Sequence, residues 1–346
     1  MRKTLLVTGG AGFIGSNFVH FMLRNRPEYD IIVLDCLAYA GSLDNLPDAV
    51  KQPDQSSGSA FRYGDICNAD LVNALTAESD KIVHFAAESH VSRSIVDSWR
   101  CVQTNIIGSQ TLVDAVRKGN GRVERMVHIS SSEVYGEAVT PQMDEAHPLN
   151  PKSPYAGAKC GADRMVYAYC ATYDLPVVTL RPFNTYGPRQ HIEKLVPRFI
   201  THVLTGQALP LHGRGEAMRD FTHVDDLCRA VDLALHAPLE QVRGEVFNVA
   251  SGTCRSVRGI AQDIARLMDA DPGRVIQLPD RPGQVARQCG DFAKIHRTLG
   301  WSPTIPWDSG LRTAIDWYAQ NPDSWRKQAL FSTQPILQPD GRIALH

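Results

Sequence analysis

The segment VTGGAGFIGSN, residues 7–17, constrains the fold of this chain more than any other part of the sequence. Three of its four glycines are spaced three residues apart, at Gly9, Gly12 and Gly15. They follow an apolar run, Thr4–Thr8, and lead into a helical pattern of apolar residues, Ile14–Leu23. Glycine permits a tight turn and a close backbone approach to a ligand, and a helix N-terminus offers N–H groups and a positive dipole to a phosphate. The segment therefore predicts the dinucleotide-binding turn of a βαβ unit.

Short apolar runs alternate with helix-length amphipathic segments through the first half of the chain. The predicted strands are Thr4–Thr8, Ile31–Asp35, Phe61–Tyr63, Lys81–Phe85, Arg125–Ser130 and Val177–Arg181. The predicted helices are Ile14–Leu23, Ala69–Ala77, Ser94–Arg117 and Ser153–Tyr173. Strands separated by helices join through right-handed crossovers, which predicts an α/β fold with a doubly wound parallel sheet of the Rossmann type.

The regular alternation of strands and helices weakens after about residue 185, where Pro and Gly become more frequent. Val246–Val249 still reads as a buried strand, and Val257–Met268 reads as a helix. We expect a nucleotide-binding domain over residues 1–184, with a strand near 245–250 that returns to it. A smaller, interleaved substrate-binding lobe is expected over residues 185–346.

Composition excludes several classes of partner. The 346 residues include 36 basic and 37 acidic side chains, a balance that predicts no binding to nucleic acid or to anionic membranes. No apolar run is long enough for a signal peptide or a membrane span, which predicts a soluble cytoplasmic protein. The eight cysteines form no CxxC pair, and the twelve histidines show no ligand spacing. We therefore expect reduced thiols and no metal site.

Asp35 ends the second predicted strand, 20 residues after Gly15. A carboxylate at this place accepts the hydroxyls of a ribose and repels a 2′-phosphate. No arginine follows at Cys36 or Leu37 to bind such a phosphate. The sequence therefore predicts that NAD is the cofactor rather than NADP.

Two further segments carry groups suited to proton transfer. In SPYAGAK, residues 153–159, Ser153 and Pro154 predict a helix start, which puts Tyr155 and Lys159 on one face, one turn apart. A neighbouring ammonium and the helix dipole both favour the phenolate of a tyrosine, whose ordinary pKa is about 10. In HISSSEVYG, residues 128–136, three serines and a glutamate end a buried strand. Such groups are costly there unless they serve a function.

These residues together resemble the extended short-chain dehydrogenase/reductase superfamily. The similarity to dTDP-glucose 4,6-dehydratases covers residues 1 to 322 and is carried by DCLAYAGSLDNL (35–46), HFAAESHVSRSI (84–95), TNIIGSQTLVDAVR (104–117), EKLVP (193–197), DRPGQVARQ (280–288) and LGWSP (299–303). RPFNTYGPRQ (181–190) and RDFTHVDD (219–226) are shared more widely among nucleotide-sugar epimerases, decarboxylases and dehydratases. The resemblance implies NAD as cofactor, a nucleoside diphosphate sugar as substrate, and a homodimer formed through the helical segments 94–117 and 154–172.

The resemblance also implies roles for the serine-rich segment. Ser131 matches a threonine that helps to hold the sugar O4, and Glu133 matches the glutamate that removes the C5 proton. Ser132 stands where the dTDP-glucose dehydratases have an aspartate that protonates the departing C6 hydroxyl. GDP-mannose 4,6-dehydratases and UDP-glucuronate decarboxylases also have serine before this glutamate. Either one carboxyl serves twice, first as base and then as acid, or Ser132 relays a water.

The site residues implied in this way fall into three groups. The catalytic residues are Ser131, Ser132, Glu133, Tyr155 and Lys159. The cofactor-binding residues are Gly9, Gly12, Phe13, Ile14, Gly15, Asp35, Asp65, Ile66, Ala86, Ala87, Tyr155 and Lys159. The substrate-binding residues are Ser89, Asn184, Glu193, Lys194, Leu195, Arg219, Asn248 and Arg281.

The sequence predicts a nucleotide-sugar 4,6-dehydratase that makes an NDP-4-keto-6-deoxyhexose by internal NAD-mediated redox. A UDP-glucuronate decarboxylase or a nucleotide-sugar 4-epimerase of the same superfamily is the alternative. A non-catalytic NAD-binding protein is a third hypothesis, disfavoured by the presence of Tyr155, Lys159 and Glu133 together. The nucleotide base of the substrate is left open.

Overall fold

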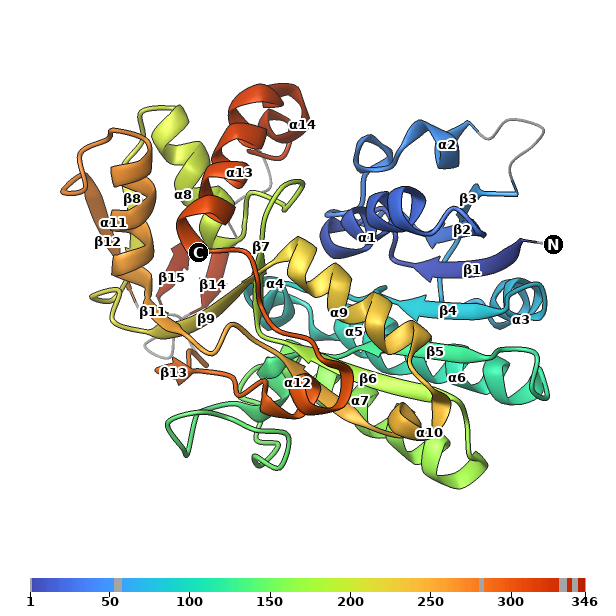
Figure 1. Ribbon diagram of the computed structural model, residues 1–346. Coiled ribbons are helices and arrows are strands. Elements are labelled where there is room, and N and C mark those ends of the chain that lie inside the picture. The colour runs from blue at the N-terminus through green and yellow to red at the C-terminus, as the bar shows by residue number, and fades with distance from the viewer. Residues whose placement is uncertain (1, 53–57, 280–282, 330–334, 338–341, 346) are drawn as a thin grey trace.

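The larger part of the molecule is built on one parallel sheet of seven strands (Figure 1). The computed structural model describes residues 2–52, 58–279, 283–329, 335–337 and 342–345. In spatial order the strands are β10 (Val246–Val249), β6 (Val177–Pro182), β5 (Arg125–Ile129), β4 (Lys81–His84), β1 (Lys3–Thr8), β2 (Tyr29–Asp35) and β3 (Ala60–Tyr63). All neighbouring pairs run parallel. The chain runs outward from β1 to β3, then returns to β4 and runs the other way. Ligands bind at such a reversal, outside the carboxyl ends of the strands.

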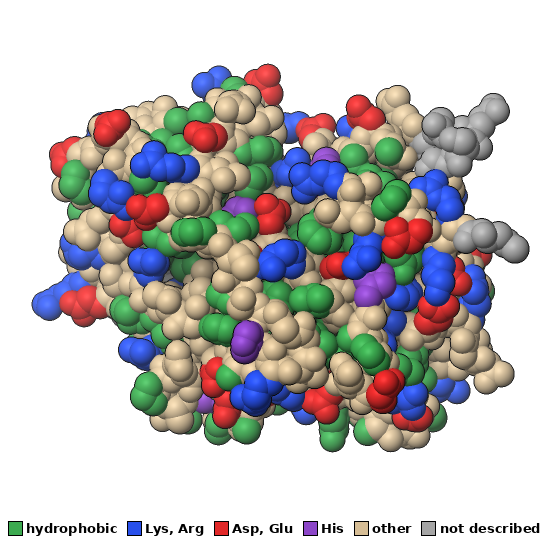
Figure 2. Space-filling view, viewed as in Figure 1, with side chains coloured by type: hydrophobic (Ala, Val, Ile, Leu, Met, Phe, Trp, Pro, Cys, Tyr) green, Lys and Arg blue, Asp and Glu red, His purple; other side chains and the backbone are tan. Residues whose placement is uncertain are grey.

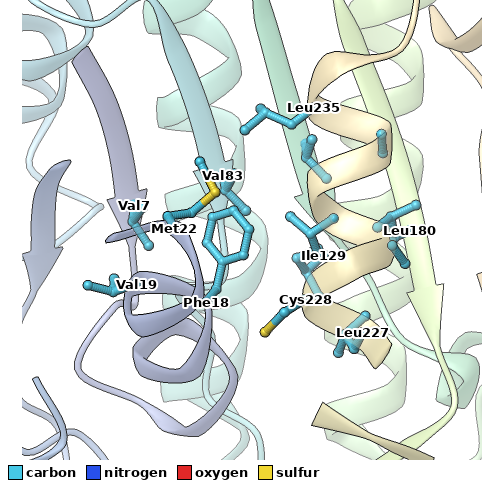
Figure 3. Close-up of a cluster of buried hydrophobic side chains, with 14 of the residues drawn as sticks. Val7, Phe18, Val19, Met22, Val83, Ile129, Leu180, Leu227, Cys228 and Leu235 are labelled. Carbon is cyan, nitrogen blue, oxygen red and sulfur yellow. The ribbon is translucent and has the colours of Figure 1, made fainter. Parts of the chain in front are cut away.

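Helices cover both faces of this sheet. α1 (Phe13–Asn25) and α9 (Val224–His236) pack on one face. α3 (Ala69–Ala77), α6 (Ser109–Lys118) and α7 (Pro154–Tyr173) pack on the other. Figure 3 shows where side chains of the first face meet: Val7, Phe18, Val19, Met22, Val83, Ile129, Leu180, Leu227, Cys228 and Leu235. The central strands are therefore apolar on both sides, as expected for a doubly wound sheet. The predicted fold class is confirmed.

One predicted helix is wrong in form. The segment expected as a single helix, Ser94–Arg117, is divided into α4 (Val91–Val96), α5 (Ser98–Cys101), a π-helical turn η2 (Val102–Gly108) and α6. The break falls at Asp97, whose backbone is extended (φ −137°, ψ 94°). The Asp97 side chain accepts a hydrogen bond from the backbone N–H of Trp99, at 3.1 Å, and so begins a new helix.

The second half of the chain contributes to both parts of the molecule. β10 lies beside β6, with Asn248 opposite Arg181, where a returning strand is expected. α9 also returns and covers the large sheet. Residues after position 184 therefore contribute to the large sheet as well as to the smaller lobe. The division into a cofactor-binding half and a substrate-binding half stays a prediction.

The smaller lobe is a set of short strands covered by helices. β9 (Met218–His223) pairs with β7 (Asn184–Tyr186), β11 (Cys254–Ser256) and β13 (Arg287–Gln288), and β8 (Leu209–His212) pairs with β12 (Val275–Leu278). Its core lies among α8 (Leu195–Leu204), α11 (Val257–Leu267) and α13 (Trp307–Gln320). The other short elements are η1 (Leu43–Asn45), α2 (Asp48–Lys51), η3 (Ser132–Tyr135), α10 (Leu239–Val242), α12 (Ala293–Leu299), α14 (Pro322–Arg326), β14 (Pro335–Leu337) and β15 (Ile343–Leu345).

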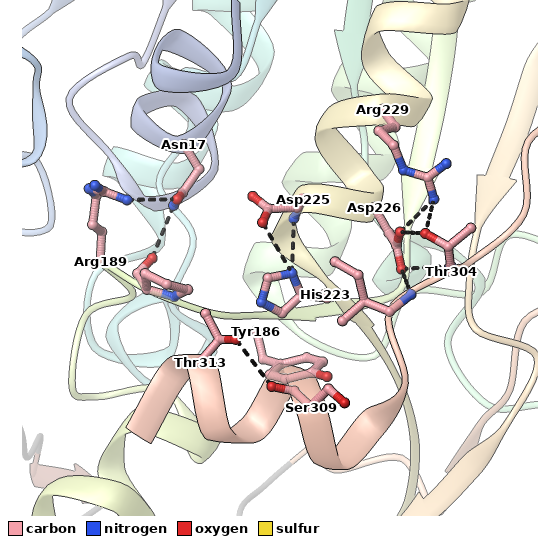
Figure 4. Close-up of polar contacts among 12 residues, drawn as sticks. Asn17, Tyr186, Arg189, His223, Asp225, Asp226, Arg229, Thr304, Ser309 and Thr313 are labelled. Carbon is pink, nitrogen blue, oxygen red and sulfur yellow. Dashed lines mark hydrogen bonds and ion pairs between the residues drawn. The ribbon is translucent and has the colours of Figure 1, made fainter. Parts of the chain in front are cut away.

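Polar contacts tie the lobe to the helices of the large sheet (Figure 4). Arg189 donates a hydrogen bond of 3.0 Å to the side chain of Asn17, on α1. The carboxylate of Asp226, on α9, is almost fully buried and accepts hydrogen bonds of 3.1 Å from the backbone N–H groups of Thr304 and Ile305. These contacts fix residues 189 and 304–305 against the two helices, α1 and α9, that cover one face of the sheet.

One expectation about the cysteines is wrong. Cys254 and Cys289 form a disulfide, although reduced thiols were expected throughout. The two residues are 35 positions apart in sequence, Cys254 at the start of β11 and Cys289 directly after β13. The other six cysteines are free.

The surface carries charges of both signs. Basic and acidic side chains are interspersed over the face shown in Figure 2. Among the described residues, no helix is long and apolar enough to cross a membrane.

Candidate active site

A cavity of about 460 Å³ opens at the carboxyl ends of β1 and β4, where the strand order reverses. Its walls come from the loops of the large sheet on one side and from α8, β8 and β9 of the smaller lobe on the other. The cavity therefore joins the two parts of the molecule, as expected for a site that must place two ligands against each other.

The glycine-rich turn forms one end of this cavity. Gly9 has φ +69°, and a Cβ added there would lie 2.5 Å from the backbone nitrogen of Ala86. A Cβ at Gly15 would overlap the carbonyl oxygen of Gly9. Gly12 precedes α1, and no side chain caps that helix. The turn thus packs closely against the loop after β4 and leaves the backbone of the first turn of α1 at the cavity wall, a cradle that fits a pyrophosphate.

Asp35 lies at the end of β2 and is held in place by its own loop. Its Oδ2 accepts a hydrogen bond of 2.9 Å from Ala11 N, and its Oδ1 accepts one of 2.8 Å from Leu37 N. Burial raises the pKa of Asp35, and these two backbone hydrogen bonds oppose that shift. Each carboxylate oxygen has a second lone pair, so both remain able to accept a hydroxyl. Asp35 therefore fits a ribose in the manner expected from the sequence.

The groups suited to proton transfer lie on two neighbouring elements that line the same cavity. Ser131, Ser132 and Glu133 follow the buried strand β5 and form the start of η3. Tyr155 and Lys159 lie on α7, whose N-terminus is capped by Ser153, which accepts a hydrogen bond from Ala156 N. All five line the cavity. The serine-rich segment is thus placed beside the Tyr155 phenol.

The pKa of Tyr155 differs from the sequence-based expectation. Burial raises this pKa above its ordinary value, a hydrogen bond with Ser131 lowers it, and the charge of Glu133 raises it further. Lys159 was expected to lower it, but the Lys159 ammonium instead donates a hydrogen bond of 2.9 Å to the carbonyl oxygen of Ile129. Burial lowers the pKa of Lys159 to about 8. In this arrangement Ser131 is the group that favours the phenolate.

Most of the predicted site residues lie around this one cavity. Those lining it are Gly9, Gly12, Phe13, Ile14, Gly15, Asp35, Asp65, Ile66, Ala86, Ala87, Ser89, Ser131, Ser132, Glu133, Tyr155, Lys159, Asn184, Glu193, Lys194, Leu195 and Arg219. Asn248 does not line it, because its side chain is fully buried between Tyr135 and the backbone of Met143. Arg281 lies outside the described residues. The ligand contacts of all these residues stay predictions.

The structure adds two residues, Tyr39 and Arg93, that were not named as site residues from the sequence. Both contact Glu193, a predicted site residue whose side chain is only 1% exposed. Tyr39 donates a hydrogen bond of 2.8 Å to its Oε1, Arg93 donates one of 3.3 Å to its Oε2, and the Arg93 guanidinium lies 3.9 Å from the centre of the Tyr39 ring. Tyr39 belongs to the motif that follows Asp35. Its place in that motif was the sequence feature that could have identified it as a site residue.

Arg198, on α8, is a third addition. It lines the cavity, burial lowers its pKa, and its Nε is buried without a hydrogen-bond partner in the described part of the chain. A guanidinium in that position can donate to an anionic or carbonyl-bearing ligand. No sequence pattern marks Arg198, since one arginine on an amphipathic helix is ordinary.

Comparison with known proteins shows which family this chain belongs to. Residues 6–314 match the family model described as GDP-mannose 4,6 dehydratase. A dTDP-glucose 4,6-dehydratase from Mycobacterium tuberculosis is 41% identical over 93% of this chain and 95% of its own length. A trifunctional UDP-glucose 4,6-dehydratase/UDP-4-keto-6-deoxy-D-glucose 3,5-epimerase/UDP-4-keto-L-rhamnose-reductase from Arabidopsis thaliana is 40% identical over 98% of this chain, but the chain spans only 51% of that protein. The chain thus spans about half the length of the Arabidopsis relatives it matches.

The solved structures agree. The crystal structure of DesIV, a dTDP-glucose 4,6-dehydratase from Streptomyces venezuelae with NAD bound, superposes with a TM-score of 0.87 at 40% identity, covering 94% of this chain and 99% of that one. These similarities confirm the resemblance expected from the sequence motifs.

Proposed function

Because the chain belongs to the GDP-mannose 4,6-dehydratase family, we propose that the protein is an NAD-dependent nucleotide-sugar 4,6-dehydratase. The observation that carries this proposal is the convergence of Tyr155, Ser131 and Glu133 on one cavity, next to the glycine-rich turn and Asp35. A base for a hydroxyl proton and a separate base for a carbon-bound proton are the two groups that this reaction needs from the chain.

Residues around the turn would hold the cofactor. The backbone at Gly12 to Gly15 receives the pyrophosphate, and Asp35 receives the adenosine ribose. When bound, NAD accepts a hydride and returns it, and the positive charge of its oxidised ring favours the phenolate of a nearby tyrosine. NAD-containing relatives such as DesIV support this assignment.

The chain's own residues carry the proton transfers. Tyr155 takes the proton from the sugar O4, while Ser131 holds that oxygen through its hydroxyl. The resulting 4-ketone acidifies the C5 hydrogen, and Glu133 removes it as a proton. The C6 hydroxyl leaves as water after it is protonated. Since Ser132 is too weak an acid to replace an aspartate unaided, the proton comes back from Glu133, either directly or through a water held by Ser132.

The substrate is a nucleoside diphosphate sugar. Arg219 lines the cavity, and its guanidinium donates 2.8 Å to the carbonyl oxygen of Val285, which fixes it at the wall. Arg219, Arg198 and Arg281 together provide cations for a diphosphate. Asn184, Glu193 and Lys194 are assigned to the sugar side.

We also propose a homodimer in the cytoplasm. Four of the twelve large hydrophobic side chains that the described residues expose lie on the helical segments expected to form the dimer interface. They are Val96, Trp99, Ile107 and Tyr167. Apolar side chains gathered in this way favour association with a second copy.

A panel of UDP-, dTDP- and GDP-hexoses tests the proposed function. The purified protein should convert at least one of them into a 4-keto product lighter by one water, without net consumption of NAD. Release of carbon dioxide from a UDP-uronic acid would support a decarboxylase instead. A C4 epimer of unchanged mass would support an epimerase, and no reaction with any sugar would support a non-catalytic protein.

A further inference from the structure

A buried ion pair lies behind the cavity, between Asp163 of α7 and Arg181 of β6. Arg181 donates 2.8 Å from Nη2 to Asp163 Oδ1 and 2.9 Å from Nε to Asp163 Oδ2, and the two side chains are 3% and 0% exposed. Burial works to raise the pKa of Asp163, but the hydrogen bonds and charge of Arg181 hold it below its ordinary value. The carboxylate is therefore charged at neutral pH. A buried pair of this kind adds little net stability over apolar residues, but it can fix the geometry of the groups bonded to it.

The pair is bonded to both ends of the serine-rich segment. Ser130 Oγ donates a hydrogen bond of 2.7 Å to Asp163 Oδ2. At the other end, Arg181 Nη1 donates one of 3.0 Å to Tyr135 Oη. Ser130 and Tyr135 flank residues 131–133, which contain the candidate base. The backbone of that segment is thus held from both sides by one ion pair.

The same pair is attached to the helix of the facing groups. Asp163 lies four residues after Lys159 and eight after Tyr155, so the three side chains share one face of α7. Tyr135 Oη also donates 2.7 Å to Asn248 Oδ1, on β10, which fixes the tyrosine from a third direction. Every hydrogen-bonding group of Tyr135 and Asp163 lies away from solvent, where such bonds are strong and costly to lose.

We propose that Asp163, Arg181 and Tyr135 are positioning residues that keep Glu133 in register with Tyr155 during the reaction. None of the three lines the cavity, so they act through the segment they hold. The proposal rests on the proposed dehydratase function, which assigns C5 deprotonation to Glu133 and O4 deprotonation to Tyr155.

Tyr135→Phe tests this inference, since it keeps the ring and removes the link to Arg181. Tyr29→Phe is the matched control. Tyr29 lies on β2, away from the cavity, and is also buried, at 3% exposed. Its Oη lies 2.9 Å from His236 Nε2. We expect kcat of Tyr135→Phe to fall about tenfold below the control while KM stays within about threefold. Bound NADH should accumulate during turnover, because C5 deprotonation slows more than C4 oxidation. A kcat within about threefold of the Tyr29→Phe value would overturn the inference.

Ser130→Ala removes the hydrogen bond to Asp163 at the other end of the segment. It should also lower kcat while KM stays nearly unchanged. Crystal structures of the two variants provide a readout that is independent of activity. The inference would be supported if the Glu133 carboxylate were displaced relative to Tyr155 in the Tyr135→Phe structure but not in the Tyr29→Phe structure. This readout would hold even if the wild type formed no keto-sugar. Failure to form a keto-sugar would reject only the proposed function. An undisplaced Glu133 would overturn the inference.

Discussion

The carboxylate of Asp35 accepts backbone N–H groups from Ala11 and Leu37 with its two oxygens, so it shapes its own loop as well as offering acceptors to a ribose. The double substitution Asp35→Ala with Cys36→Arg removes the charge that repels a 2′-phosphate and adds a cation for it. We expect the preference of the protein to change from NAD to NADP, measured as the ratio of the two dissociation constants. The ratio is the proper quantity, because loss of the two backbone hydrogen bonds weakens binding of both cofactors.

Cys36→Arg alone is the control for this change. It retains the repelling carboxylate and should keep the preference for NAD. Equal affinity of the wild type for the two cofactors would contradict the role of Asp35.

Tyr155 is the second residue whose role can be measured directly. Tyr155→Phe keeps the ring and removes the phenol, so C4 oxidation should fall by about 100-fold or more while NAD remains bound. Single-turnover absorbance of NADH measures this step, and fluorescence titration with NAD measures the binding. A loss of less than about tenfold, or 1.4 kcal/mol, would show that another group takes the O4 proton.

Sequence reasoning at this scale depends on whether a residue lies in a motif. Glu133, Tyr155 and Asp35 stand at strand or helix ends with a clear spacing, so they could be predicted to meet. Arg198 could not, because only the packing of α8 turns it toward the cavity. The pKa direction of Tyr155 was expected wrongly, since it depends on burial and on where the Lys159 ammonium finds an acceptor.

Among the elements, β5 contains a histidine with an unusual environment. His128 is 1% exposed, and neither ring nitrogen has a hydrogen-bond partner in the described part of the chain. Burial, with the charge of Lys159, lowers its pKa to about 3 from an ordinary value of 6.5. The native protein therefore keeps His128 neutral at a pH where the unfolded chain binds a proton. The depressed pKa of His128 has no effect on the free energy of unfolding above about pH 6.5. It lowers that free energy as the pH falls from 6.5 toward 3.

His128→Phe should remove that share of the pH dependence. Between pH 6.5 and 4.5, the free energy of unfolding of the wild type should fall more steeply than that of the variant, by up to about 1.4 kcal/mol per pH unit. Urea denaturation at several pH values measures both slopes. Parallel slopes would contradict a neutral His128 in the native state.

The secondary structure follows local patterns where these are strong and departs from them where one side chain intervenes. The central strands of the large sheet were predictable because both of their faces are buried, which leaves continuous apolar runs. The helix predicted over Ser94–Arg117 fails at Asp97, since the aspartate caps a new helix instead of continuing the old one. The packing of α9 on the large sheet was not predicted. It requires the chain to return to that sheet from the smaller lobe, and the local pattern of apolar residues does not show such a return.

For the whole molecule, association is the first property to test. Ile107, on η2, and Ile276, on β12, are each 48% exposed, so they form a matched pair. Ile107→Glu places a charge in the proposed dimer interface and should shift the protein toward the monomer in analytical ultracentrifugation. Ile276→Glu should leave the dimer intact. Equal effects of the two substitutions, or a monomeric wild type, would contradict the proposed interface.

Contacts far apart in sequence were the least predictable. The Cys254–Cys289 disulfide joins residues 35 positions apart, and the Asp163–Arg181 pair joins the helix α7 to the strand β6. Neither spacing carries a local signal, so the sequence predicted free thiols for the first and no role for the second.

The fate of the hydride tests the central claim most directly. A substrate hexose labelled with deuterium at C4 should yield a 4-keto product with that deuterium at C6, because the hydride taken from C4 is returned within the same active site. Mixing labelled and unlabelled sugars that differ in mass elsewhere should give no crossover between molecules, as measured by mass spectrometry and NMR. Deuterium returned to C4, with carbon dioxide released from a UDP-uronic acid or with an epimer formed, would contradict the assignment as a 4,6-dehydratase.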